Sequence, residues 1–287
     1  MNLIKYILLS FLFSNILFAD IPAIVPVDWL KKNYDNSKVV IIDLRPAKEY
    51  AKGHLKNSVN IPGQPDAQLL FDSKLLMPKL NIISNRLSNA GIDKDSLVVV
   101  YDSGVFMWAA RLYWILDFLG HDKVGILKVG YGGWNKGELP ISKTDFKAQR
   151  KDFIPMIDNS KIKTKLDTLL AIGKKTIIDG RVIPHYKGKE SLAKRFGHIP
   201  TAKNYACTQN YEVTASGNRM RDLQELKGVY KDLPKDKEII LYCDGGAEAA
   251  LNVIVLQELG YKASVYDGSW LEWGNDSSLP ISNPSKK

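Results

Sequence analysis

The chain has 287 residues, which is enough for two domains of ordinary size. Its composition, 45% hydrophobic and 25% charged with no low-complexity tract, is typical of a folded globular protein and excludes a disordered chain. The net charge of +9 comes from basic residues interleaved with acidic ones, without an arginine-rich run among aromatics. We therefore expect no nucleic-acid partner, whereas small anionic substrates stay open.

The first nineteen residues have the pattern of a secretory signal peptide. Lys5 supplies the positive start, residues 6–18 are almost wholly apolar, and Ala19 offers a cleavage site. An apolar run of about thirteen residues is too short to span a bilayer comfortably. We therefore expect export to the periplasm, with no membrane span after the signal is removed. The two cysteines would then lie where disulfides are permitted.

The rest of the chain contains one unit twice. In each copy a β-branched strand leads into Asp-x-Arg, a Gly-His turn follows, a second buried strand and a helix closing at glycine come later, and Leu-Pro-Ile-Ser ends the copy. The corresponding segments are 39–45 and 176–181, 53–55 and 197–199, 98–102 and 239–243, 139–142 and 279–282. Agreement in order, type and spacing indicates a duplication.

Strands that alternate with helical stretches predict an α/β fold, with a parallel sheet flanked by helices on both faces in each copy. We place the first domain at residues 20–142 and the second at 162–287. Residues 143–161 are charged, lack sustained periodicity and are interpreted as the linker. Ligands of such sheets bind beyond the carboxyl ends of the strands.

Cys243 lies at such an end. It follows the apolar strand 239–242 and precedes a loop with Gly245 and Gly246 and a helix that ends at Gly260. The loop amides and the helix N-terminus would point at the sulfur, favour a thiolate and hold an anion bound to it. A structural cysteine at the end of a core strand is the alternative, which the glycine loop disfavours.

Three motifs resemble the rhodanese family: Asp-x-Arg-x-x-x-Glu-Tyr-x-x-Gly-His-Leu at 43–55, the cysteine loop at 239–260, and Tyr-Asp-Gly-Ser-Trp-Leu-Glu-Trp at 266–273. The whole mature chain is similar to tandem sulfurtransferases, whose first domain is catalytically silent. Asp102 at the place of Cys243 fits that plan. The resemblance implies that Cys243 takes sulfur from thiosulfate, 3-mercaptopyruvate or polysulfide, holds it as a persulfide, and passes it to cyanide, a thiol or a partner protein.

The sequence also departs from that family. Two carboxylates in the loop would raise the pKa of the thiol and repel a dianion, and His185 stands where thiosulfate enzymes usually have arginine. A basic insertion, Lys187, Lys189, Lys194 and Arg195, either supplies the missing charge or is a solvated loop. The loop that we expect to bind the substrate and the persulfide comprises Asp244, Gly245, Gly246, Ala247, Glu248 and Ala249.

Other residues receive supporting interpretations. Asp179 and Arg181 are expected to form a buried pair that positions the loop, rather than to do chemistry. His54 and His198 are expected to be structural, and we expect neither a metal nor a cofactor, because no ligand cluster is evident. Cys207 could form a disulfide, be a resolving thiol, or be a buried structural thiol, which is our prediction.

Three further interpretations concern function. A phosphatase is excluded, because Cys-x5-Arg would need arginine where Ala249 stands. A persulfide carrier for a partner enzyme is an alternative that the acidic loop favours. A non-catalytic binding module is a second alternative, which Cys243 and its loop disfavour. After Asp102 the first copy lacks the Gly-Gly loop, so we expect that Asp102→Cys would not create a second active site.

Overall fold

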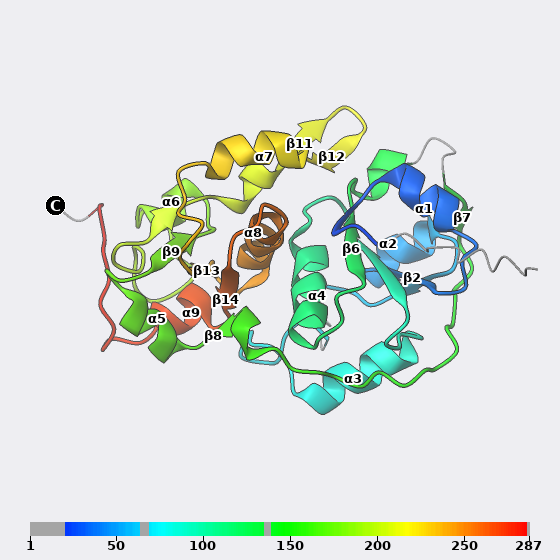
Figure 1. Ribbon diagram of the computed structural model, residues 1–287, viewed down its shortest axis with the longest axis horizontal. Helices are drawn as coiled ribbons and strands as arrows, with labels where there is room; N and C mark the ends of the chain where they lie inside the picture. The colour runs from blue at the N-terminus through cyan, green and yellow to red at the C-terminus, as the bar shows by residue number, and fades with distance from the viewer. Residues whose placement is uncertain (1–20, 64–68, 135–138, 286–287) are drawn as a thin grey trace, which may run out of the picture.

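The computed structural model describes residues 21–63, 69–134 and 139–285, so the predicted signal peptide and its cleavage site lie outside the described residues. No helix within these residues is long and apolar enough to cross a membrane. The described chain forms two lobes that lie side by side (Figure 1). We call the described residues up to 142 the first lobe and those from 159 onward the second lobe.

The first lobe is built on a five-stranded parallel sheet of order β1-β6-β5-β2-β4. Its strands are β1 (Ile24–Val25), β2 (Val39–Asp43), β4 (Ser58–Asn60), β5 (Leu97–Tyr101) and β6 (Val124–Leu127). Its helices are α1 (Val27–Asn33), α2 (Ala47–Lys52), α3 (Leu80–Asn89), α4 (Met107–Phe118) and the 3-10 turn η1 (Tyr131–Trp134). An antiparallel pair, β3 (His54–Leu55) and β7 (Ile141–Ser142), closes the lobe.

The second lobe repeats this plan with the order β8-β14-β13-β9-β10. Its strands are β8 (Ile162–Lys163), β9 (Thr176–Asp179), β10 (Lys203–Asn204), β13 (Ile239–Tyr242) and β14 (Ala263–Tyr266). Its helices are α5 (Lys165–Ala171), α6 (Ile183–Tyr186), α7 (Leu223–Tyr230), α8 (Ala247–Glu258) and α9 (Ser269–Trp273), with the 3-10 turns η2 (Asn159–Lys161) and η3 (Cys207–Asn210). Because the two sheets share one strand order, the predicted duplication is confirmed at the level of topology.

Both faces of each sheet are buried, as the near-continuous apolar strands predict. In β5, Val98 and Val100 face the core shared with α3 and α4, whereas Val99 packs toward α1 and η1 on the other side. In β13, alternate residues likewise divide between the core with α7 and α8 and the core with α5 and α9. The predicted α/β fold with helices on both faces is therefore confirmed.

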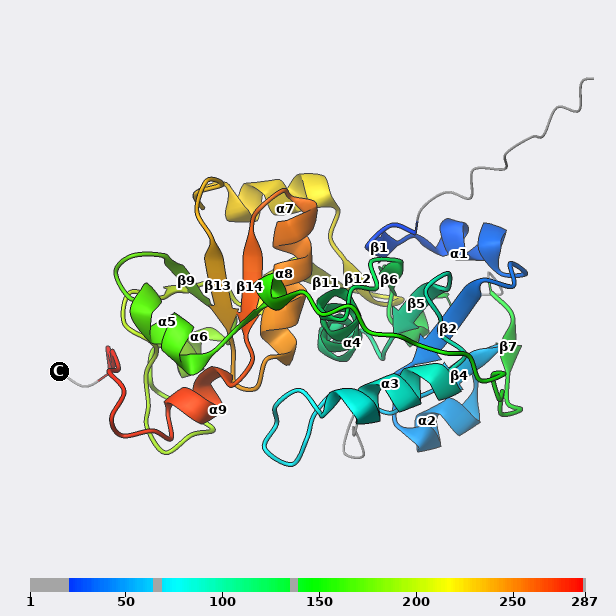
Figure 2. The same ribbon diagram turned by 60° about the horizontal axis from the view of Figure 1, so that its bottom comes forward.

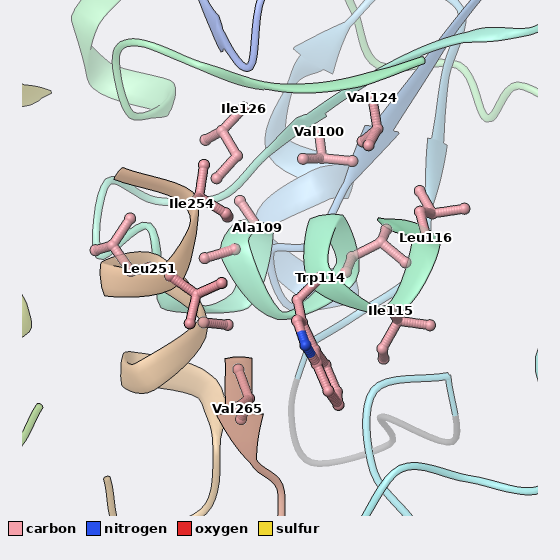
Figure 3. Packing of buried hydrophobic residues seen from close by; sticks show 14 of the residues in the cluster. Val100, Ala109, Trp114, Ile115, Leu116, Val124, Ile126, Leu251, Ile254 and Val265 are labelled. Carbon is pink, nitrogen blue, oxygen red and sulfur yellow. The ribbon is translucent and has the colours of Figure 1, made fainter. Parts of the chain in front are cut away.

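The two lobes share a core. Helices α4 and α8 pack against each other between the two sheets (Figure 2). Figure 3 shows Ala109 of α4 close to Ile254 of α8, and both belong to one buried cluster. The loops at the N-termini of these two helices, which follow Asp102 and Cys243, are thereby brought to the boundary between the lobes.

A hairpin of the second lobe, β11 (Tyr211–Thr214) and β12 (Gly217–Met220), extends onto the first lobe (Figure 1). The amide of Gly130 donates to the carbonyl of Asn218 at 3.0 Å, and the amide of Met220 donates to the carbonyl of Lys128 at 2.8 Å. The hairpin therefore joins the lobes through backbone hydrogen bonds. The stretch predicted to be a linker also packs on the first lobe, where Phe153 is buried and its amide donates to Ser88 Oγ at 3.1 Å.

Candidate active site

Cys243 follows β13 directly and is almost fully buried, with 1% of its surface exposed. Its carbonyl accepts from the amide of Trp270 at 2.9 Å, and its amide donates to Ser269 Oγ at 3.2 Å. The loop after it is held by α9, because the amide of Leu271 donates to the carbonyl of Asp244 at 3.0 Å. These contacts fix the backbone on which the sulfur is carried.

The loop amides point at the sulfur, as expected. The amide of Gly246 donates to Cys243 Sγ at 3.0 Å, and the amides of Gly245 and Ala249 also interact with the sulfur. Gly246 has φ +86°, and a Cβ there would meet Arg111 Nη1 at 2.7 Å, so both its conformation and its surroundings require glycine. The sulfur thus sits in a cradle of N–H groups that suits an anionic persulfide.

The same site opposes ionisation of the unmodified thiol. Burial raises the pKa of Cys243 to about 12, and the charges of Glu248 and Asp244 add to that effect. The amides lower the pKa but do not offset burial and the two carboxylates. The loop amides lower the pKa and the acidic loop residues raise it, both as expected, but burial adds to the acidic residues and outweighs the amides.

A cavity of about 230 Å³ opens over Cys243 between the two lobes. Its walls are largely apolar and its floor is the cysteine loop. The first lobe contributes Phe71, Leu75, Met107 and Trp108, and the second contributes Leu192, Leu271, Cys243, Asp244, Gly245, Ala247 and Glu248. No basic side chain is among these lining residues of the described chain. Such a cavity suits a small ligand of low charge better than it suits a small dianion.

Asp179 and Arg181 form the buried pair that we predicted. Arg181 donates through Nε and Nη2 to the Asp179 carboxylate, with a shortest distance of 2.6 Å, and Nη2 also donates to the carbonyl of Gly197 at 2.8 Å. Tyr242 donates its hydroxyl to Asp179 at 2.7 Å. The pair lies at the end of β9 beside the cysteine loop, and the same arrangement of Asp43, Arg45 and Tyr101 recurs in the first lobe.

His185 is engaged with the loop rather than open to an anion. Its Nδ1 lies 2.9 Å from Asp244 Oδ2, while Arg181 Nη1 lies 3.6 Å from Asp244 Oδ1. Burial raises the pKa of Asp244, and the charges of Arg181 and His185 counteract that rise. Arg181 and His185 are therefore both engaged with Asp244 at this edge of the site.

None of the four basic residues of the insertion is among the described residues that line the cavity. Arg195 donates to the backbone carbonyls of Leu279 and Trp273 at 2.8 and 2.7 Å, which fixes the C-terminal segment. The residue of this segment that reaches the cavity is Leu192, with 66% of its surface exposed. The sequence analysis did not predict that Leu192 contacts the cavity, because no sequence pattern sets this residue apart from the lysines around it.

The two histidines of the Gly-His turns are structural, as expected. His54 Nδ1 lies 2.9 Å from the carbonyl of Tyr50, and His198 Nδ1 lies 2.8 Å from the carbonyl of Tyr186. Each ring stacks on that tyrosine, with ring centroids 3.6 and 4.0 Å apart. Across the described ranges, no group of three His, Cys, Asp or Glu residues is placed to hold a metal ion.

Asp102 occupies the equivalent loop of the first lobe. Its carboxylate accepts from the amides of Gly104 at 2.7 Å, Phe106 at 3.0 Å and Ala109 at 3.4 Å. This loop therefore forms a cradle of amides although it lacks the Gly-Gly pair, and a carboxylate fills it. The hairpin covers it as well, because Asn218 Nδ2 donates to the carbonyl of Gly104 at 2.8 Å.

Sequence reasoning missed a buried ion pair between the lobes. Arg111 of α4 is fully buried, and its Nη1 lies 2.7 Å from Oδ1 of Asp267, next to the cysteine loop. Its guanidinium lies 4.6 Å from the ring centroids of both Phe71 and Trp114. The available signal was an arginine within the mostly apolar stretch 107–118. Its partner lies 156 positions further along the chain, so the sequence did not indicate the pair.

Cys207 begins η3 and is buried and free, as is Cys243. Its amide donates to the carbonyl of Gly180 at 2.8 Å. Burial raises the pKa of Cys207 above its usual value, with smaller contributions from Glu248 and Cys243. The structure thus places it as a buried, protonated thiol near the site, in agreement with our prediction.

Comparisons with known proteins agree with this geometry. The family model for the rhodanese-like domain matches residues 26–137 and 163–276. The 3-mercaptopyruvate sulfurtransferase of Escherichia coli (strain K12) is 29% identical over 279 residues, covering 90% of this chain and 96% of that protein. The thiosulfate sulfurtransferase of Azotobacter vinelandii is 26% identical over 276 residues, covering 92% and 98%.

Solved structures show the same fold. The crystal structure of SseA from Escherichia coli, a 3-mercaptopyruvate enzyme, matches with a TM-score of 0.74 at 27% identity, covering 86% of this chain and 98% of that one. The anaerobic ergothioneine biosynthesis enzyme from Chlorobium limicola shares the fold, with a TM-score of 0.79 at 21% identity, covering 91% and 70%.

Two tandem α/β lobes, one with a cysteine in an amide cradle, define a sulfurtransferase. The relatives named for this activity match almost the whole chain. The chain belongs to the rhodanese family.

Proposed function

We propose that this sulfurtransferase uses Cys243 as its nucleophile and carries the transferred sulfur as a Cys243 persulfide. The observation that carries the proposal is the hydrogen bond from the Gly246 amide to Cys243 Sγ, 3.0 Å long, at the floor of a cavity between the lobes. An additional sulfur on Sγ would extend into this cavity, and the loop amides would stabilise its negative charge. The first lobe is silent because a carboxylate holds the equivalent cradle.

The donor that suits the site is one of low charge, 3-mercaptopyruvate or polysulfide, in preference to thiosulfate. Asp244 and Glu248 line the cavity, and the guanidinium of Arg181 and the imidazole of His185 are engaged by carboxylates. A dianion would meet two like charges, and no basic side chain among the described lining residues offsets them. Asp179, Arg181 and His185 support the loop that Asp244 begins and do not contact the donor.

A persulfide carrier is the second candidate. The exposed leucines at the mouth of the cavity, Leu75 at 42% and Leu192 at 66%, favour it, because they would lie against a partner protein that presents an acceptor thiol.

We also propose that residues 1–19 direct the chain to the periplasm, that residues 20–142 and 162–287 are the two domains, and that 143–161 join them. N-terminal sequencing of the secreted protein tests the cleavage after Ala19.

An intact-mass experiment tests the function. The protein is incubated with 3-mercaptopyruvate, polysulfide or thiosulfate, and its mass is measured before and after cyanide is added. We expect a gain of one sulfur atom that cyanide removes. Cys243→Ser should keep the fold but show no gain in mass. Cys207→Ser is the matched control and should still gain one sulfur atom. Cyanide-dependent sulfur transfer by Cys243→Ser would refute the assignment of Cys243 as the nucleophile.

A further inference from the structure

Glu248 lies in the first turn of α8, on the wall of the cavity that holds Cys243. Its carboxylate and the Cys243 thiol line the same cavity, and the two side chains interact. Among the ion pairs of the described residues, none includes Glu248, although the side chain is largely buried. A buried carboxylate without a cationic partner is costly to the fold, and such groups are concentrated at functional sites.

The surroundings of Glu248 favour a group that gains and loses a proton. Asp244 and Asp179 face it with like charge, Arg181 faces it with opposite charge, and Cys207 and Tyr211 interact with it from η3 and β11. From α4 of the first lobe, Met107 and Trp108 close the cavity without a charge. Burial, followed by the charge of Asp244, raises the pKa of Glu248 to about 7. Its carboxyl group can therefore hold or release a proton near neutral pH.

We propose that Glu248 is a catalytic acid and base, which takes the thiol proton from Cys243 as the sulfur attacks the donor and then gives it to the leaving group. This inference rests on the proposed role of Cys243 and adds the residue that moves the proton. A base in contact with the thiol is needed here, because the site opposes a free thiolate.

The chemistry balances with 3-mercaptopyruvate as the donor. The Cys243 thiol gives its proton to the Glu248 carboxylate, and the Cys243 sulfur forms a bond to the donor sulfur. The carbon–sulfur bond of the donor breaks, and its electron pair stays on the carbon as the enolate of pyruvate. Glu248 returns the proton to that carbon, which yields pyruvate and a Cys243 persulfide. No oxidant or reductant is consumed, and Glu248 ends as the carboxylate that began the cycle.

The proposal predicts a donor-dependent effect. With polysulfide, the leaving group is a stable anion that needs no proton, so only the base step is lost when Glu248 is removed. With 3-mercaptopyruvate, both the base step and the acid step are lost. A side chain that merely positions the loop would affect both donors to the same extent. The ratio of the two losses therefore separates a catalytic role from a structural one.

The test measures single-turnover persulfide formation by quenched intact-mass analysis, from pH 5.5 to 8.5, for the wild type, Glu248→Gln and Glu248→Asp. Glu258→Gln, at the other end of α8, is the matched control. We expect Glu248→Gln to slow transfer from 3-mercaptopyruvate by about 10²–10³-fold, to slow transfer from polysulfide less, and to lose the fall in rate below about pH 7. Glu248→Asp should recover part of the rate, and Glu258→Gln should match the wild type.

The sign of the pH dependence follows from the base form. Below about pH 7 Glu248 is protonated and cannot accept the thiol proton, so the wild-type rate falls as the pH falls. A folded Glu248→Gln protein that keeps the wild-type rate and pH profile with both donors would overturn this inference. That result would not affect the proposed role of Cys243 as the nucleophile. A wild-type chain that gains no sulfur from either donor would overturn the proposed function itself, and this inference with it. Equal losses with both donors would assign Glu248 a structural role.

Discussion

Replacing Arg111 with methionine tests the joint between the lobes. The side chain is fully buried, and its Nη1 lies 2.7 Å from Asp267, whose own side chain is 10% exposed. Its Nε donates to the carbonyl of Leu70 at 3.2 Å, while Asp267 Oδ2 accepts from the amide of Met77 at 2.8 Å. Methionine keeps most of the apolar packing but leaves the Asp267 carboxylate without its cation.

The magnitude follows from burial. Breaking a buried pair by removing one partner costs about 3–5 kcal/mol of unfolding free energy. For a chain of this size, each kcal/mol shifts the thermal midpoint by about 2–4 °C, which gives a fall of roughly 6–20 °C. Activity should fall as well, because Arg111 Nη1 lies against Gly246, whose amide donates to the Cys243 sulfur.

Thermal and urea unfolding, followed by circular dichroism, measure the effect. The double variant Arg111→Met with Asp267→Leu should recover much of the loss, since replacing a buried pair by apolar residues is often neutral. Glu49→Ala breaks the exposed pair with Lys52 and should leave the midpoint unchanged. A single Arg111→Met protein that melts within about a degree of the wild type would refute the reasoning from burial.

Three further predictions concern the site. Asp244→Arg combined with His185→Arg should improve thiosulfate use, chiefly through a lower KM in a cyanide assay, because a repulsive charge becomes attractive; a wild-type preference for thiosulfate that these changes do not enhance would refute the charge argument. Asp102→Cys should carry no persulfide by peptide mass mapping, because the hairpin covers that cradle; sulfur found on residue 102 would contradict this. A non-reducing peptide map of active protein should show Cys207 and Cys243 free, and a disulfide between them would instead indicate a redox-gated enzyme.

The sequence by itself determined the duplication, the α/β class and the position of Cys243. These depend on local patterns: a buried strand alternates its side chains between two faces, and a glycine permits the turn that begins the next helix. The pair of Asp179 and Arg181 is also local, because two residues separated by one position at a strand end reach each other within the same turn. Each of these features could be predicted from residues close together in the chain.

The tertiary structure alone decided which groups surround the sulfur. The partner of Arg111, the contact of Leu192 with the cavity and the pairing of His185 with Asp244 all join segments that are far apart in sequence. The hairpin that covers Asp102 comes from the other lobe. Burial decided the state of the thiol too, since it outweighs the loop amides and raises the pKa of Cys243. Burial and charge at a point depend on everything packed around it, and no local pattern encodes that sum.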